Sequence, residues 1–150
     1  MTDYTLLCSR LRALTEGVPH VIANLANASA LLYDQLDRLN WAGFYLMQQG
    51  MLVLGPFQGK PACIQIAVGK GVCGTAVARV ETIRVQDVHQ CPGHIACDSA
   101  SQSEIVVPIR VNGEVFGVLD IDSPFLNRFS AEDQRGLEQF VHILEKALSI

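Results

Sequence analysis

Apolar side chains recur every three or four positions between residues 4 and 36, where glycine and proline are rare. This spacing predicts two amphipathic helices that cover a sheet. Gly17-Val18-Pro19 separates the two helices, because glycine and proline end a helix. The pattern rests on Leu7, Leu11 and Leu14 in the first helix and on Val21, Leu25, Ala28 and Leu32 in the second.

From Trp41 onward, the apolar residues form short runs bounded by turn residues. Residues 41–47 and 51–54 flank Gln48-Gln49-Gly50, which predicts a β-hairpin. Residues 55–61 are rich in glycine and proline and predict a loop. Beyond this loop, the pattern predicts a strand at 64–68, a short helix at 72–79 and a strand at 82–85.

Asn112-Gly113 is the strongest turn signal in the chain, and it lies between apolar runs at 104–109 and 115–121. It predicts a second β-hairpin. Because side chains alternate along a strand, Asp120 and Asp122 share one face of the second strand, while Leu119 and Ile121 point to the other.

The last segment begins with Ser130, which is typical of a helix N-cap, followed by acidic residues in the first turn. Helices at both ends and about six strands between them predict an α+β fold in a single domain over residues 1–150. We expect a central antiparallel sheet with the N- and C-terminal helices packed on one face. The apolar face of the last helix consists of Leu137, Phe140, Val141, Leu144 and Leu148.

Composition narrows the class of protein. The chain has 150 residues, 49% of them hydrophobic, which is enough for one core. Its net charge of −4 and the lack of a basic run argue against nucleic acid as a partner. No signal peptide and no apolar run of membrane-spanning length are present, so we expect a cytoplasmic protein without membrane contact.

Five cysteines in a reducing compartment indicate catalysis, metal binding or simple burial. Cys97 lies in a loop of small and polar residues, and Cys63 follows the glycine- and proline-rich loop. Two thiols on pliable segments can meet, one as nucleophile and one as resolving partner. Cys73 stands near a predicted helix N-terminus, which lowers a thiol pKa. Buried, inert cysteines are the alternative for all three.

The acidic residues Asp98, Glu104, Asp120 and Asp122 form a second candidate set. Carboxyl groups held close together raise at least one pKa, which creates a proton donor, and the remaining charge can hold an ammonium group. An exposed face of an edge strand is the alternative. A third set, His89, Cys91, His94 and Cys97, has zinc-type ligands, but it is compressed into nine residues and lacks the paired spacing of structural zinc sites.

Several motifs, taken together and in order, closely resemble the free methionine-(R)-sulfoxide reductases, which are GAF-domain enzymes. The resemblance covers about residues 41–129. It rests on the runs Asn40-Trp41-Ala42-Gly43-Phe44-Tyr45, Gly55-Pro56-Phe57-Gln58-Gly59-Lys60-Pro61-Ala62-Cys63, Gly69-Lys70-Gly71-Val72-Cys73-Gly74-Thr75-Ala76, Gly93-His94-Ile95-Ala96-Cys97-Asp98, Ser103-Glu104-Ile105-Val106-Val107-Pro108 and Leu119-Asp120-Ile121-Asp122-Ser123.

The resemblance implies reduction of the free amino acid, with no cofactor or metal. It makes Cys97 the catalytic cysteine, Cys63 the resolving cysteine and Cys73 a third cysteine that can assist disulfide exchange. Cys91 matches no family cysteine in these motifs, and it is either an inert addition or an extra partner in disulfide exchange. Thioredoxin is implied as the reductant, and a homodimer is plausible. The residues implied for the substrate pocket are Trp41, Glu104, Asp120 and Asp122.

Two other classes of protein stay open at this point. One is a GAF module that binds a small molecule and signals through a partner without turnover. The other is a thiol or zinc redox sensor. Substrate-dependent loss of two thiols would separate the reductase from both.

Overall fold

The computed structural model describes residues 2–91, 93 and 98–149 and confirms the predicted α+β fold. The elements follow one another as α1 (Tyr4–Thr15), α2 (Val21–Gln35), β1 (Trp41–Gln48), β2 (Met51–Gly59), β3 (Gln65–Ala67), α3 (Gly71–Arg79), β4 (Ile83–Val85), a 3-10 turn (Val88–Gln90), β5 (Ser103–Val111), β6 (Glu114–Ser123) and α4 (Ala131–Leu148).

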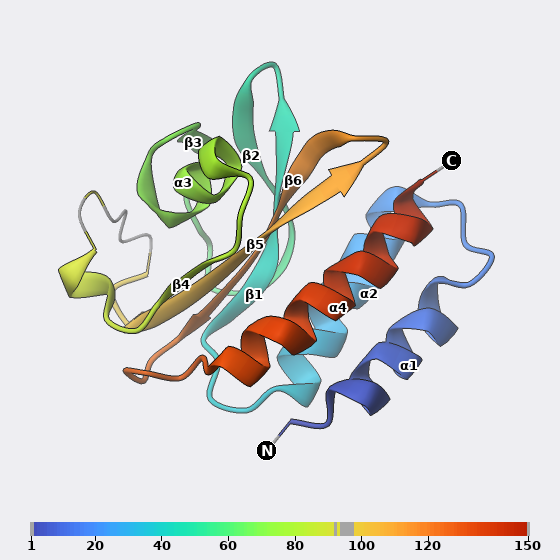
Figure 1. Ribbon diagram of the computed structural model, residues 1–150, viewed down its shortest axis with the longest axis horizontal. Coiled ribbons are helices and arrows are strands. Elements are labelled where there is room, and N and C mark those ends of the chain that lie inside the picture. Colours follow the sequence, from blue (N-terminus) through green and yellow to red (C-terminus); the bar gives the residue numbers. More distant parts are fainter. Residues whose placement is uncertain (1, 92, 94–97, 150) are drawn as a thin grey trace.

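The described residues form one six-stranded antiparallel sheet in the order β3-β2-β1-β6-β5-β4. Helices α2 and α4 pack on one face, and α1 packs on α4 and α2 as an outer layer (Figure 1). The short helix α3 covers the opposite face, where it contacts β5 and β6. The N- and C-terminal helices therefore share one side of the sheet, and the other side keeps room for a site beside α3.

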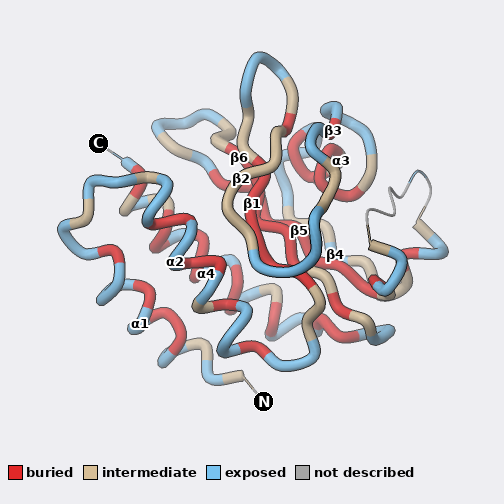
Figure 2. The backbone as a smooth tube through the Cα atoms, turned by 180° about the vertical axis from the view of Figure 1, so that it is seen from behind, coloured by how far each residue is buried: buried red, intermediate tan, exposed pale blue. Residues whose placement is uncertain are grey.

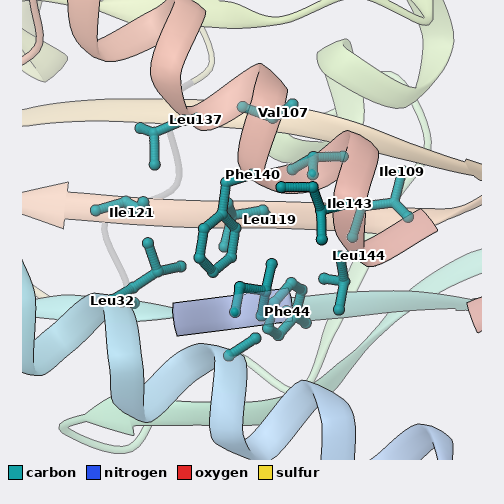
Figure 3. Packing of buried hydrophobic residues seen from close by; sticks show 14 of the residues in the cluster. Leu32, Phe44, Val107, Ile109, Leu119, Ile121, Leu137, Phe140, Ile143 and Leu144 are labelled. Atoms are coloured by element: carbon teal, nitrogen blue, oxygen red, sulfur yellow. The ribbon is translucent and has the colours of Figure 1, made fainter. Parts of the chain in front are cut away.

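The alternation of side chains along β1 separates two cores. Phe44 points toward α2 and α4, where it packs with Leu119 of β6 and Phe140 of α4 (Figure 3). Trp41 and Tyr45 point the other way, into a smaller cluster against α3. The buried backbone of the central strands lies between these two cores (Figure 2).

Local signals explain the ends of several elements. Ser130 and Asp133 form a capping box at the start of α4, with the Ser130 hydroxyl accepting a hydrogen bond from the Asp133 amide. Asn112 and Gly113 both have positive φ, as the predicted hairpin turn requires. Gly74 lets α3 approach β3, because an added Cβ would lie 2.4 Å from the Ala67 carbonyl oxygen.

Strand β2 is longer than the sequence predicts. The segment 55–59 has loop-like composition, yet it continues the pairing with β1 as far as Gly59 opposite Trp41. Pro56 lies at the irregularity of the β1–β2 pairing, between the pairs Gly43–Phe57 and Tyr45–Leu54, and a bulge is a position where a strand tolerates proline. None of the helices within the described ranges has the length and apolar character needed to cross a membrane.

Candidate active site

A pocket opens on the α3 side of the sheet, at the end where β1, β5 and β6 lie side by side. The strands supply Trp41, Tyr45, Glu104, Asp120 and Asp122, and α3 supplies Cys73. The loop 60–64 contributes Pro61 and Ala62, and the turn after residue 97 contributes Asp98 and Ser101. All four residues predicted for substrate binding therefore line one pocket.

The register of the sheet brings these residues together. Asp122 of β6 pairs with Trp41 of β1 on one side and with Glu104 of β5 on the other. Asp120 lies two residues away on the same face, opposite Gly43 and Val106. Glu104 and Asp120 are each 6% exposed and Asp122 is half-buried, so the three carboxyl groups lie together where water has little access. The alternative of an exposed edge strand is wrong, because β6 is a central strand.

Burial and mutual repulsion keep protons on this cluster. Burial, together with the Asp122 charge, raises the pKa of Glu104 to about 8. Burial and the Asp120 charge raise the pKa of Asp122 well above its ordinary value. A lone carboxyl group in water is ionised above pH 5, whereas carboxyl groups of this cluster stay protonated near neutral pH because of the fold.

Cys73 faces the same carboxyl groups from α3. The Cys73 Sγ, one carboxylate oxygen of Glu104 and one carboxylate oxygen of Asp120 all lie within 4.8 Å of one another. Burial, followed by the charge of Asp120, raises the pKa of the Cys73 thiol well above its ordinary value. The position near the start of α3 predicts a lowered pKa, and this prediction is wrong because burial among acids outweighs the helix terminus.

Asp98 behaves differently from the three buried acids. Its carboxylate accepts hydrogen bonds from the Ala100 amide (2.9 Å) and from the Asn40 side-chain amide (3.0 Å). These bonds lower the pKa of Asp98. Asn40 also donates to the Ser101 hydroxyl (3.0 Å), so it ties the turn at residues 98–101 to the start of β1. The rim of the pocket therefore carries an ionised carboxylate.

The aromatic residues of β1 form one wall of the pocket. Trp41 stacks on Tyr45 with ring centroids 5.9 Å apart, and on Phe57 at 5.1 Å. Both β1 residues are buried. Tyr45, Asn40 and Ser101 were missing from the predicted site residues, although the spacing of Tyr45 four residues after Trp41 on one strand face could have indicated it.

The cysteines occupy different environments. Cys63 is half-buried and disulfide-bonded, and it follows the pocket residues Pro61 and Ala62. Cys8 is a free thiol buried in the core on the opposite side of the sheet. Cys91 is half-buried, and burial together with the Glu104 charge raises the pKa of its thiol. Cys97, the predicted nucleophile, lies outside the described residues, but its neighbour Asp98 lines the pocket.

The predicted zinc set also falls partly outside the described residues, because it includes His94 and Cys97. Within the described ranges, the group with metal-ligating side chains consists of Cys73, Glu104 and Asp120 and includes neither His89 nor Cys91.

A six-stranded antiparallel sheet with helices on both faces and a pocket beside the short helix defines a GAF domain. The family model of the GAF domain matches residues 22–149. The chain is 60% identical to Protein YtsP of Bacillus subtilis, over 98% of this chain and 91% of that protein. It is 56% identical to the free methionine-R-sulfoxide reductase of Escherichia coli, over 97% of this chain and 88% of that protein.

A solved structure described as the fRMsr of Staphylococcus aureus in complex with substrate superposes with a TM-score of 0.95 at 55% identity, covering 99% of this chain and 97% of that one. The chain belongs to the GAF-domain family of free methionine-R-sulfoxide reductases. The family resemblance inferred from the sequence motifs is thereby confirmed.

Proposed function

We propose that this protein reduces free methionine-(R)-sulfoxide to methionine, with Cys97 as nucleophile and Cys63 as resolving cysteine. The observation that carries the proposal is the cluster of Glu104, Asp120 and Asp122 in the pocket that Trp41 and Tyr45 also line. A sulfoxide needs a proton on its oxygen before a thiolate attacks its sulfur, and this cluster holds protons near neutral pH. Membership of the reductase family supports the same reaction.

The first step transfers two electrons from the Cys97 sulfur to the substrate sulfur. The Cys97 thiolate attacks that sulfur while a carboxyl group of the cluster, Glu104 in this proposal, donates its proton to the sulfoxide oxygen. The attack forms a bond between the two sulfur atoms, and the protonated oxygen then passes from the substrate sulfur to the Cys97 sulfur. The S–O and S–S bonds to the substrate sulfur break, their electron pair stays on that sulfur, methionine leaves, and Cys97 is left as a sulfenic acid. The deprotonated Glu104 regains a proton from water.

Recognition of the free amino acid uses the aromatic wall and the charged rim of the pocket. The indole of Trp41 offers an apolar, polarizable surface to the S-methyl group. The ionised Asp98 at the rim offers its charge to the α-ammonium group. A peptide-bound methionine sulfoxide lacks that positive charge, so it leaves Asp98 without its partner and binds weakly.

The second step restores the thiols. The Cys63 thiol attacks the sulfenic sulfur of Cys97, a disulfide forms, and water leaves. A dithiol protein of the thioredoxin type then reduces the disulfide by thiol exchange. The state of Cys63 supports this assignment, because it is disulfide-bonded and its loop lines the pocket, whereas the free thiol of Cys8 is buried in the opposite core.

Replacing Cys63 by serine tests the order of the two steps. We expect one equivalent of methionine in a single turnover, because the sulfoxide reacts with Cys97 before Cys63 takes part. Steady-state turnover with thioredoxin should fall by about 100-fold or more, since no intramolecular disulfide forms and the effective concentration of a second thiol is lost. Methionine is measured chromatographically after one and after many equivalents of substrate.

Cys91→Ser is the control for this experiment, because Cys91 is also a half-buried cysteine and the proposed mechanism gives it no part in either step. Multiple turnovers in Cys63→Ser at the wild-type rate would contradict the resolving role. Loss of the first methionine would show that Cys63 is needed for attack on the sulfoxide.

Cys73 stays outside the exchange route in this proposal, in contrast to the role implied by the resemblance. Its thiol is 4% exposed and raised in pKa, and both properties disfavour a thiolate that reaches a disulfide. Cys73→Ser should therefore keep multiple turnovers with thioredoxin, with kcat within about threefold of wild type, since serine retains a hydrogen-bond donor toward Asp120.

Cys8→Ser provides the matched control for Cys73→Ser, because it also replaces a buried thiol, in the other core. Comparing the melting temperatures of the two variants separates loss of stability from loss of exchange. Turnover of Cys73→Ser that stops after the first equivalent, with a melting temperature equal to that of the control, would put Cys73 back into the exchange.

A further inference from the structure

The loop that carries Cys63 is held by the aromatic wall of the pocket. Trp41 donates a hydrogen bond from its indole Nε1 to the Lys60 carbonyl oxygen, 3.1 Å away. Tyr45 donates from its hydroxyl to the carbonyl oxygen of Cys63 itself, 2.9 Å away. Two side chains that line the pocket therefore fix the backbone at both ends of the segment 60–63.

The tyrosine is itself held firmly. Its side chain is 2% exposed, and its ring stacks on that of Trp41 at an interplanar angle of 24°. Tyr45 lies on β1, which pairs with β2 on one side and with β6 on the other. Because the Tyr45 hydroxyl is fixed by a strand that is paired on both sides, it also fixes the position of the Cys63 carbonyl group that it binds.

The far side of Cys63 is also anchored. The amide of Leu54 in β2 donates to the Ile64 carbonyl oxygen at 2.9 Å. Consecutive carbonyl groups at residues 63 and 64 are thus bound by different strands, one through the Tyr45 side chain and one through the β2 backbone. The Cα of Cys63 directly precedes the carbonyl group that Tyr45 binds and follows the Lys60 carbonyl that Trp41 binds, so the direction of its sulfur depends on the Tyr45 bond most directly.

The Tyr45 hydroxyl stays a donor over the whole working range of pH. Burial, followed by the charge of Asp120, raises the pKa of Tyr45 above its ordinary value. An ionised phenolate would lose the bond to the Cys63 carbonyl, and the carboxyl cluster beneath the ring opposes that ionisation. The nearby carboxyl groups therefore keep Tyr45 protonated, and its hydroxyl proton remains available to the Cys63 carbonyl.

We propose that Tyr45 is a positioning residue for the resolving step, and that its hydroxyl holds the Cys63 backbone where the thiol meets the oxidised sulfur of Cys97. This inference rests on the proposed roles of the two cysteines. Tyr45 takes no part in the electron transfer. Its hydroxyl acts through Cys63, so its removal affects disulfide closure more than methionine release.

Tyr45→Phe is the test, because it keeps the buried ring and removes only the donor. Reduced enzyme is mixed with one equivalent of methionine-(R)-sulfoxide and quenched at intervals, and methionine and remaining thiols are counted in each sample. We expect disulfide closure to slow by about tenfold relative to methionine release, since a half-buried carbonyl loses its hydrogen bond. The sulfenic acid should accumulate and react with a sulfenic-acid probe.

Tyr33→Phe is the control, because Tyr33 lies on α2 and is 39% exposed, away from the pocket. The inference would be overturned if Tyr45→Phe slowed methionine release and disulfide closure by the same factor. It would also be overturned if Tyr45→Phe closed the disulfide at the wild-type rate. Failure of the proposed function looks different, because wild-type enzyme would then release methionine without loss of two thiols, or release none.

Discussion

Cys97→Ser is expected to abolish the reduction of free methionine-(R)-sulfoxide, with a loss in kcat/KM of about 10⁴-fold or more. A serine hydroxyl at neutral pH is a far weaker nucleophile than a thiolate, and it cannot take up the oxygen as a sulfenic acid. The measurement is methionine formed in a single turnover, so the result does not depend on thioredoxin. Retained turnover would refute the assignment of the nucleophile.

Binding provides the internal control for Cys97→Ser. The pocket residues Trp41, Asp98 and Glu104 are unchanged in this variant, so it should still bind the substrate. Calorimetric titration of Cys97→Ser with methionine-(R)-sulfoxide is expected to show saturable binding of one equivalent, and methionine should bind Cys97→Ser and wild type with Kd values within a few-fold of each other. If Cys97→Ser neither bound the substrate nor reacted with it, the pocket itself would be damaged, and the melting temperature of the variant would then show whether the fold is intact.

Glu104→Gln is expected to lower kcat/KM by about 10²- to 10³-fold, because the glutamine keeps the shape of the side chain but carries no acidic proton. In the wild-type enzyme, the pKa of Glu104 near 8 means that the donor is present at pH 7 and is lost above pH 8. The kcat/KM of the wild type should therefore fall about tenfold per pH unit above 8. The variant should show no such fall.

The same group gives a stability test with a definite sign. The folded-state pKa of Glu104 lies above its ordinary value of 4.5, so the folded protein binds more protons than the unfolded chain between about pH 4.5 and 8. Unfolding free energy from this group therefore decreases as pH rises through that window. Glu104→Gln should flatten the dependence, whereas Glu114→Gln, on the exposed end of β6, should leave it unchanged. Equal pH profiles for wild type and Glu104→Gln would contradict the proton-donor role.

The hydrophobic pattern was sufficient to predict the helices and both hairpins, because local signals and burial agree there. Ser130 caps α4, Asn112-Gly113 forms the tight turn, and the alternation around Leu119 puts Asp120 and Asp122 on the face away from the larger core. The segment 55–59 was predicted as a loop, because pairing with β1 is a long-range interaction that local composition does not report.

Electrostatics of the site depended on neighbours that are distant in sequence. Cys73 is in a segment whose local features favour a lowered pKa, yet its thiol faces Glu104 and Asp120, which lie 31 and 47 positions further along the chain in the sequence. Conversely, Asp98 belongs to the same set of acids by sequence, but its hydrogen bonds to Asn40 and to a backbone amide lower its pKa. Charge state follows from burial and partners, and neither can be inferred from residue type.

The sequence by itself determined the family, through motifs in a fixed order. It also determined the helices, the two hairpins and the face of β6 that carries the acids, since these depend on short-range patterns. Only the tertiary structure decided that Trp41, Glu104 and Asp122 stand in one row across three strands, and that Tyr45 holds the backbone of Cys63. Register and hydrogen bonds between distant segments arise from packing of the whole chain, which no local pattern specifies.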